Sequence, residues 1–117
     1  VYSYTNKSQY QGRVEYALAS GALSVEAADV SLRVWRGLGC RDAGRVDLRC
    51  DERGRVHFLE VNPLAGLHPV DSDLAVLCGL IGTSYRELIA MILSSAGERL
   101  SNAGPRLRAA ATVADGV

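Results

Sequence analysis

Four polar residues lie inside two short apolar segments that read as strands: Arg45, Asp47, Glu60 and Asn62. Two carboxylates held close together repel each other unless positive charge lies between them. Carboxylate and amide oxygens on rigid strands suit Mg²⁺, whose remaining positions go to water or nucleotide phosphates. A guanidinium beside such oxygens stabilises negative charge that develops in a transition state. The four residues therefore predict a magnesium platform with an arginine next to it.

A simpler interpretation of the same residues stays open. Arg45 alone could neutralise the two carboxylates, which gives a solvated face with a surface ion pair worth about 0–1 kcal/mol. Asn62 favours the metal interpretation, because its amide oxygen is a neutral hard ligand.

A β-hairpin is the element that must position these residues. Strands are expected at residues 43–50 and 55–62, joined by the polar turn 51–54. This register places Arg45 opposite Glu60. Side chains alternate between the two faces of a strand, so one face is apolar and meets the core. The apolar face is expected to hold Val46, Leu48, Cys50, Leu59 and Val61. The polar face is expected to hold Arg45, Asp47, Arg49, Phe58, Glu60 and Asn62.

The same alternation of side chains predicts which face of the hairpin carries each of its two aromatic rings. Phe58 is expected on the polar face, opposite Asp47, and His57 on the core side. His68 lies in the loop after the hairpin and is expected to be polar surface.

The segments before the hairpin predict strands at residues 1–4 and 13–19, with a polar loop at 5–12 between them. Ser24 is the expected N-cap of a helix that has Glu26 in its first turn. The apolar stripe of that helix is Val25, Ala28, Leu32 and Trp35. Gly37 and Gly39 are expected to end it.

The segments after the hairpin predict two helices. Asp71 or Ser72 caps a short apolar helix at residues 73–81, which Gly82 ends. Ser84 and Glu87 then form a capping box. The helix that follows has one apolar face, made of Tyr85, Leu88, Ile89, Ile92, Leu93 and Ala96. This pattern decays from Gly97 onward.

Composition narrows the function classes. The chain has 117 residues, 48% of them hydrophobic and 22% charged, which is typical of a globular domain. Its formal net charge of zero argues against a nucleic-acid or membrane-surface partner. The three cysteines, Cys40, Cys50 and Cys78, form no CxxC pair and indicate a reduced, cytoplasmic chain with buried thiols. The start at Val1 instead of Met predicts an excerpt of a longer protein.

The segment "GCRDAGRVDLRCDERGRVHFLEVNPLAGLHP" resembles the C-terminal ATP-grasp segment of the D-alanine–D-alanine ligases. That family pairs an Arg-x-Asp strand with a strand ending in Glu-x-Asn-x-x-x-Gly, which here ends at Gly66. The segment "GTSYRELIAMIL" is similar to the family's last helix, and "VYSYTNK" to its Tyr-x-Tyr-x-x-Lys segment. The resemblance implies an α+β fold, an antiparallel sheet covered by helices. It implies a partial ATP-grasp domain at residues 1–98 and leaves 99–117 as a loose tail.

The resemblance also implies a role for each matching residue. The family's chemistry is ATP-dependent peptide bond formation through an acyl phosphate, in peptidoglycan precursor synthesis. Two Mg²⁺ ions would be held by Asp47, Glu60 and Asn62, with Glu60 bridging. Arg45 would face the transferred phosphoryl group and the tetrahedral intermediate, and Lys7 would reach the γ-phosphate of ATP. The acceptor amino acid would be bordered by Gly66, Asp71 and Ser72.

Two departures from the family pattern limit this expectation. Asp71 stands where the family has a hydroxyl, and it would repel an acceptor carboxylate, so an acceptor other than D-alanine stays open. The family's N-terminal and central lobes, with the adenine pocket and lid, have no counterpart in these 117 residues. Those lobes are the expected partners, and the isolated chain is expected to be inactive and to form a homodimer. The alternative is an autonomous, non-catalytic interaction or scaffold domain.

Overall fold

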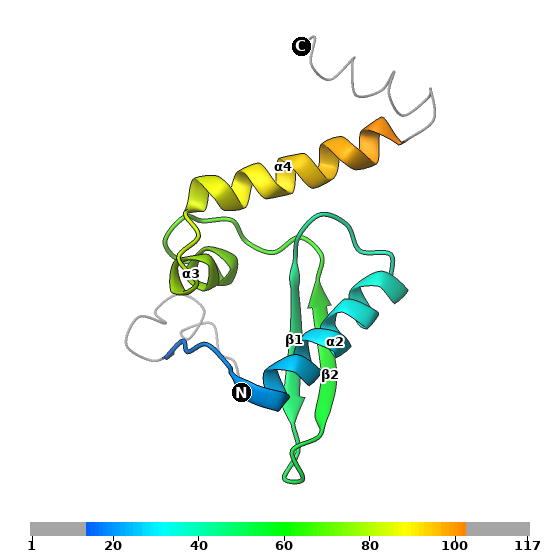
Figure 1. Ribbon diagram of the computed structural model, residues 1–117, viewed down its shortest axis with the longest axis vertical. Coiled ribbons are helices and arrows are strands. Elements are labelled where there is room, and N and C mark those ends of the chain that lie inside the picture. Colours follow the sequence, from blue (N-terminus) through cyan, green and yellow to red (C-terminus); the bar gives the residue numbers. More distant parts are fainter. Residues whose placement is uncertain (1–13, 103–117) are drawn as a thin grey trace.

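A hairpin and three helices make up the part of the chain that the computed structural model describes, residues 14–102. In chain order they are α2 (Gly21–Gly37), β1 (Arg45–Cys50), β2 (Val56–Asn62), α3 (Asp73–Leu80) and α4 (Tyr85–Ser101). In Figure 1, α2 lies along the β1–β2 hairpin, whereas α4 crosses the top of the view above α3. The α+β class and the antiparallel pairing are therefore confirmed. The predicted strand at residues 1–4, the loop at 5–12 and most of the predicted tail lie outside the described residues.

The hairpin turn is organised by Asp51. Its Oδ1 accepts the backbone N–H groups of Arg53 and Arg55, both at 2.9 Å. Gly54 has a φ of +75°, a conformation that glycine adopts without the strain of a Cβ atom. The second strand consequently begins at Val56, one residue later than predicted, and the first begins at Arg45, two residues later.

The strand register differs from the prediction by one residue at the turn, where Cys50 lies opposite Val56 instead of Arg55, and by a second residue beyond a bulge in β2. Asp47 lies opposite Glu60, but its neighbour Leu48 lies opposite Phe58, so Leu59 is the extra residue. An extra residue reverses the alternation of faces beyond it. Phe58 therefore shares the apolar face with Leu48, and the prediction that it lies on the polar face is wrong.

The same bulge corrects His57. It lies opposite Arg49, on the polar side of the hairpin instead of the core side. Its Nε2 is 3.1 Å from Oδ2 of Asp51. The four residues of the predicted platform lie on the side of the bulge that is farther from the turn and still share one face, although Arg45 lies opposite Asn62 instead of Glu60.

Helix α2 begins earlier than predicted. Ser20 occupies the N-cap position with extended backbone angles, although its side chain makes no capping hydrogen bond. Ser24, the predicted cap, lies inside the first turn, and its hydroxyl donates to the carbonyl of Gly21 at 2.8 Å. Residues 14–19 are irregular, so the predicted strand at 13–19 is wrong for the part that is described.

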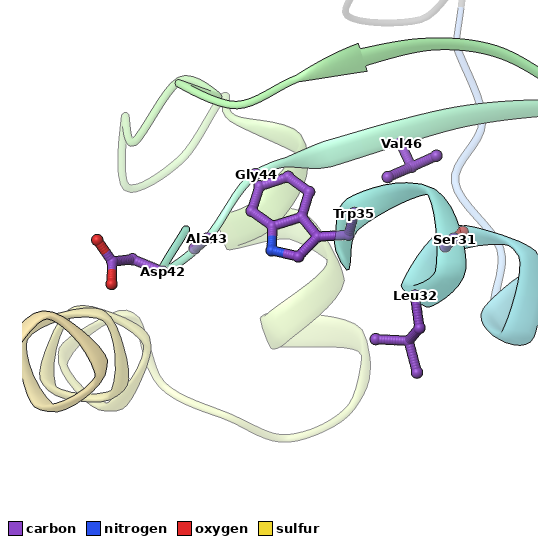
Figure 2. Close-up of a pocket in the computed structure, with 7 residues that line it drawn as sticks. All are labelled: Ser31, Leu32, Trp35, Asp42, Ala43, Gly44 and Val46. Carbon is purple, nitrogen blue, oxygen red and sulfur yellow. The ribbon is translucent and has the colours of Figure 1, made fainter. Parts of the chain in front are cut away.

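Trp35 packs α2 against the hairpin, as its place in the apolar stripe predicts. Figure 2 shows its indole ring over Gly44. A Cβ atom at Gly44 would lie 2.3 Å from Cη2 of Trp35 and 2.5 Å from the carbonyl oxygen of Asn62. Only glycine therefore fits between the ring and the end of β2. The ring, Leu32, Val46 and their neighbours line an open cavity of about 300 Å³ on the apolar side of the hairpin.

Helices α3 and α4 pack against each other after a turn at Gly82, which has a φ of +78°. Both predicted helix starts are confirmed, at Asp73 and at Tyr85. Cys78 and Leu88 are buried between these elements, at 6% and 5% exposure. Leu93, predicted on the core face, is 65% exposed. Helix α4 continues past Gly97 to Ser101.

Asp42 attaches α4 to the start of the hairpin. Its carboxylate accepts Nη2 of Arg99 at 2.7 Å and the hydroxyl of Ser95 at 3.2 Å. In Figure 2 its side chain points toward α4, away from the tryptophan. Arg99 holds the pKa of Asp42 below its ordinary value.

Much apolar surface remains exposed within residues 14–102. Among the large hydrophobic side chains, Leu64 is 95% exposed and Val25 is 70% exposed. Cys50 is exposed and Cys40 half-buried, so the expectation of buried cysteines holds for Cys78 alone.

No single helix in this part of the chain is long and apolar enough to cross a membrane. The helices α3 and α4 meet such a criterion only as a pair, and that pair is bent by 114°.

Candidate functional site

Arg45 is the centre of the polar face. Its Nε donates to Oδ1 of Asp47 at 2.6 Å, and its Nη2 donates to Oδ2 of the same carboxylate at 2.9 Å. Both residues belong to β1, two positions apart, so the strand places them on one face. This two-pronged pairing matches the fork of a guanidinium to the two oxygens of a carboxylate.

A second carboxylate reaches Arg45 from a different element. Nη1 of Arg45 donates to Oδ2 of Asp73, the first residue of α3. The other oxygen of Asp73 accepts the hydroxyl of Tyr16 at 2.8 Å. The irregular segment before α2, the hairpin and α3 therefore meet at one cluster of charged side chains.

Glu60 and Asn62 complete the polar face from β2. Glu60 lies opposite Asp47, and its Oε1 is 3.9 Å from Nη2 of Arg45. The amide of Asn62 donates to the same oxygen at 3.5 Å. With a side chain that is 64% exposed, Glu60 is the most accessible of the acidic groups around Arg45.

The electrostatics of the cluster favour a bound cation. Hydrogen bonds and charge from Asp47, and then from Asp73, raise the pKa of Arg45 above its ordinary value. One guanidinium faces three carboxylates, those of Asp47, Glu60 and Asp73. The excess negative charge is what an added divalent cation would neutralise.

The predicted Mg²⁺ ligands are brought together in part. Asp47, Glu60 and Asn62 share one face and offer only oxygen donors, the chemistry that Mg²⁺ requires. Both oxygens of Asp47 are, however, paired with Arg45. Within residues 14–102, no group of three His, Cys, Asp or Glu side chains is arranged to hold a metal ion. The donor set fits Mg²⁺, and binding would require Asp47 to exchange Arg45 for the ion.

The loop after β2 folds back on itself at the predicted acceptor residues. A Cβ atom at Gly66 would lie 3.7 Å from Cβ of Ser72, so the two positions adjoin. Ser72 is buried, and its hydroxyl donates to the carbonyl of His68 at 2.6 Å. The Ser72 hydroxyl is therefore used to close the loop.

His68 has a structural part in that loop, beyond the polar surface that was expected. Its Nδ1 accepts the backbone N–H groups of Val70 and Asp71, at 3.3 and 3.1 Å. The carboxylate of Asp71 lies 3.4 Å from the same nitrogen.

Sequence reasoning missed two members of the cluster, Asp73 and Tyr16. Asp73 lies 28 positions from Arg45, and Tyr16 lies 57 positions from Asp73. Asp73 was recognised only as the start of a helix, and Tyr16 as part of a strand that does not form. Lys7, the predicted γ-phosphate ligand, lies outside the described residues.

The comparisons with known proteins agree with the arrangement of the elements. The two-stranded antiparallel sheet and the helices of residues 14–102 are consistent with the C-terminal part of an ATP-grasp fold. The family described as "D-ala D-ala ligase C-terminus" matches residues 1–94. The chain belongs to this family.

Three relatives illustrate the similarity. The D-alanine–D-alanine ligase of Bordetella petrii is 37% identical over 75 residues, which are 64% of this chain and 23% of that protein. The D-alanine–D-alanine ligase of Aquifex aeolicus is 32% identical over 95 residues, which are 80% of this chain and 32% of that protein. The uncharacterized protein y4sG of Sinorhizobium fredii is 39% identical over 71 residues, 61% of this chain and 21% of that protein. The matches thus extend over no more than a third of these curated relatives.

Proposed function

We propose that this chain is the C-terminal part of an ATP-dependent ligase that joins a carboxylate to an amine, of the D-alanine–D-alanine ligase type. The observation that carries the proposal is the shared polar face of the hairpin. It presents two opposed carboxylates, an amide and a guanidinium on neighbouring strands of a chain in this family. ATP and Mg²⁺ would be needed by the complete enzyme, whose product would serve peptidoglycan precursor synthesis in the cytoplasm.

Each residue of the polar face has a proposed task. Asp47, Glu60 and Asn62 would hold two Mg²⁺ ions. These ions, when bound, neutralise phosphate charge and orient the γ-phosphate. Arg45 would stabilise the phosphoryl group during its transfer to the substrate carboxylate, and then the tetrahedral intermediate formed when the amine attacks the acyl phosphate.

Residues outside the hairpin would hold the substrates. Lys7 would contact the γ-phosphate. The acceptor amine would lie beside the adjoining Gly66 and Ser72, with Asp71 nearby on the same loop. Because Asp71 is an acid with a side chain that is 43% exposed, it would disfavour an acceptor with a free carboxylate close to it.

A chimera tests the catalytic proposal directly. Residues 1–95 of this chain would replace the matching segment of the Aquifex aeolicus ligase, and phosphate release would be measured with ATP, Mg²⁺ and a panel of amino acids. Activity that falls at least about 100-fold in an Arg45→Met chimera would agree with electrostatic catalysis by Arg45. An Arg49→Met chimera is the matched control, because Arg49 lies on the same strand outside the cluster. A folded chimera that releases no phosphate with any acceptor would contradict the proposal.

The cation site can be tested on the 117-residue chain itself. Mn²⁺ should bind weakly, with a dissociation constant on the millimolar scale, because no nucleotide phosphate completes the shell. NMR signals of Asp47, Glu60 and Asn62 should broaden before those of Asp51, a carboxylate in the hairpin turn. Broadening that begins at Asp51 instead would place the cation elsewhere.

The alternative, a non-catalytic interaction domain, is favoured by one observation: Arg45 already occupies both oxygens of Asp47. The isolated 117-residue chain is expected to be inactive under either proposal, because its matches span no more than about a third of the length of relatives such as the Aquifex aeolicus ligase. Turnover by the isolated chain near an ordinary enzyme rate of about 1 s⁻¹ would contradict both. The chimera separates the two proposals, since a scaffold domain would not support turnover.

A further inference from the structure

Arg45 divides its hydrogen bonds between two acids on different elements. Nε and Nη2 point to Asp47 on its own strand, whereas Nη1 points to Asp73 at the start of α3. Surface arginines with a single partner leave the site when that partner is taken. The two-sided arrangement gives Arg45 a second attachment that does not depend on Asp47.

The second attachment is itself fixed. The hydroxyl of Tyr16 donates to the remaining oxygen of Asp73 at 2.8 Å, which sets the orientation of the carboxylate. Asp73 is also the first residue of α3, the end of a helix at which acidic side chains are commonly found. Asp73 is therefore oriented to accept a hydrogen bond from Arg45 whether or not Asp47 also accepts one.

If a cation bound to Asp47, Arg45 would need another acid as its partner at the polar face. A divalent ion and a guanidinium repel each other and compete for the same two oxygens. Glu60 could not hold Arg45 instead, because it is itself a proposed Mg²⁺ ligand and its Oε1 lies 3.9 Å from Nη2. Asp73 is the remaining acid with a hydrogen bond to the guanidinium.

We propose that Asp73, oriented by Tyr16, is the positioning residue that keeps Arg45 at the polar face when a divalent cation takes Asp47. This inference rests on the proposed function, since it assumes that a cation binds there. In the absence of Asp73, Arg45 would fall back on Asp47 and compete with the ion.

The first test needs no metal. In an Asp47→Asn chain, the arginine has lost its charged partner on β1, as it would when a cation is bound. Separate, slowly exchanging Nη signals of Arg45 should persist in NMR spectra of this chain. The same signals should collapse in an Asp47→Asn/Asp73→Asn chain. If the Nη signals of Arg45 already collapse in the Asp47→Asn chain, where Asp73 is intact, the inference is overturned, because Asp73 would then not hold the arginine.

The second test measures Mn²⁺ affinity in a double-mutant cycle. Asp73→Asn should weaken Mn²⁺ binding about fivefold when Arg45 is present, and less than about twofold in an Arg45→Met chain. The difference between these two backgrounds measures the part of the effect that depends on Arg45. The direct loss of one negative charge is common to both and cancels. Equal weakening in both backgrounds, or no weakening in either, would overturn the inference.

Two further readouts keep the outcomes distinct. Circular dichroism should show unchanged helix content in the Asp73→Asn chain, and Tyr16→Phe provides a milder variant that should weaken Mn²⁺ binding in the same direction. If no chain binds Mn²⁺ at several millimolar, the cation site of the proposed function is wrong, and this inference fails with it. If all chains bind but the cycle shows no coupling, the inference alone fails.

Discussion

Gly44 lies where α2 and the end of β2 approach the start of the hairpin. Both the indole of Trp35 and the carbonyl oxygen of Asn62 crowd the position that a Cβ atom would take there. A methyl group would have to displace both a rigid ring and backbone. This position therefore couples the packing of α2 to the geometry of the proposed cation ligand Asn62.

The substitution Gly44→Ala should destabilise the fold by about 1–3 kcal/mol, the usual cost of adding volume to a tightly packed site. Urea unfolding followed by tryptophan fluorescence measures it directly at Trp35. Gly97→Ala is the matched control: nothing lies within 4 Å of its Cβ position in α4. That control should gain up to about 1 kcal/mol from helix propensity. An equal response of the two variants would contradict the close approach at Gly44.

Asp51 should give the hairpin a specific dependence on pH. The backbone N–H of Arg55, the ring of His57 and the Arg55 guanidinium lower the pKa of Asp51 from 3.8 to about 2. A folded-state pKa below the unfolded value means that the stabilising effect is complete above about pH 4. The effect is lost as pH falls through about 2.

Unfolding at a series of pH values tests this expectation. The free energy of unfolding should fall less steeply between pH 4 and 2 in an Asp51→Asn chain than in the natural sequence. Glu52→Gln, in the same turn, should leave the slope unchanged. Identical slopes for the natural sequence and Asp51→Asn would mean that Asp51 titrates normally.

At the residue scale, the sequence predicts partners only over short distances. The spacing of Arg45 and Asp47 places them on one face of any strand, and that pairing is found. The bulge at Leu59 could not be foreseen, because no glycine or proline marks it, and it moved Phe58 to the apolar face. The contact between Arg45 and Asp73 depends on how α3 docks, which no local pattern encodes.

At the scale of elements, the capping box shows the opposite case, in which local chemistry decides the structure. The hydroxyl of Ser84 accepts the backbone N–H of Glu87 at 3.2 Å, and the carboxylate of Glu87 accepts the N–H of Ser84 at 2.7 Å. Both donors belong to the start of α4 and would otherwise lack helical partners. The start of α4 is thus readable from four consecutive residues.

The substitution Ser84→Ala should cost about 1 kcal/mol of stability, a typical value for the loss of an N-cap hydroxyl. Thermal unfolding by circular dichroism gives the measurement. Ser94→Ala makes the same chemical change on the exposed middle of α4 and should be neutral or slightly stabilising. A Ser84→Ala chain as stable as the Ser94→Ala chain would show that α4 depends on its packing against α3 alone.

Two other elements show where local signals fail. Residues 13–19 alternate like a strand, but alternation specifies a strand only when a partner supplies hydrogen bonds, and the described part is irregular. Helix α2 begins at Gly21 instead of after Ser24, because the backbone after Ser20 turns helical without a side-chain cap. The N-cap preference of serine does not distinguish two serines four positions apart.

At the scale of the molecule, the most prominent feature is the amount of exposed apolar surface. Within residues 14–102 only Cys78, Leu88 and Ser72 are buried, and α2 buries no residue. Large side chains on several elements face solvent, including those of Leu64 and Val25. The chain matches no more than about a third of its curated relatives. Exposed surface of this kind fits a segment that packs against further lobes.

We expect the isolated chain to self-associate for the same reason. Within residues 14–102 the sheet has two strands, each with an edge, and exposed apolar surface beside such edges invites pairing between copies. The formal net charge of zero gives little long-range repulsion to oppose it. The simplest closed arrangement is a two-fold homodimer in which both copies use the same surface. Sedimentation equilibrium over a tenfold concentration range should therefore show an average mass that rises toward twice that of the monomer.

Two variants identify the surface that is used. Leu64→Asn removes an exposed side chain from the loop after β2, and Val25→Asn removes one from α2, with exposures of 95% and 70%. Neither change costs much internal packing, so a weakened association reports on the contact between copies. The variant that lowers the average mass locates the interface at the element that carries the substituted residue. A monomeric mass for the natural sequence at about 100 μM would contradict the prediction, because mass action at that concentration should populate even a weak dimer.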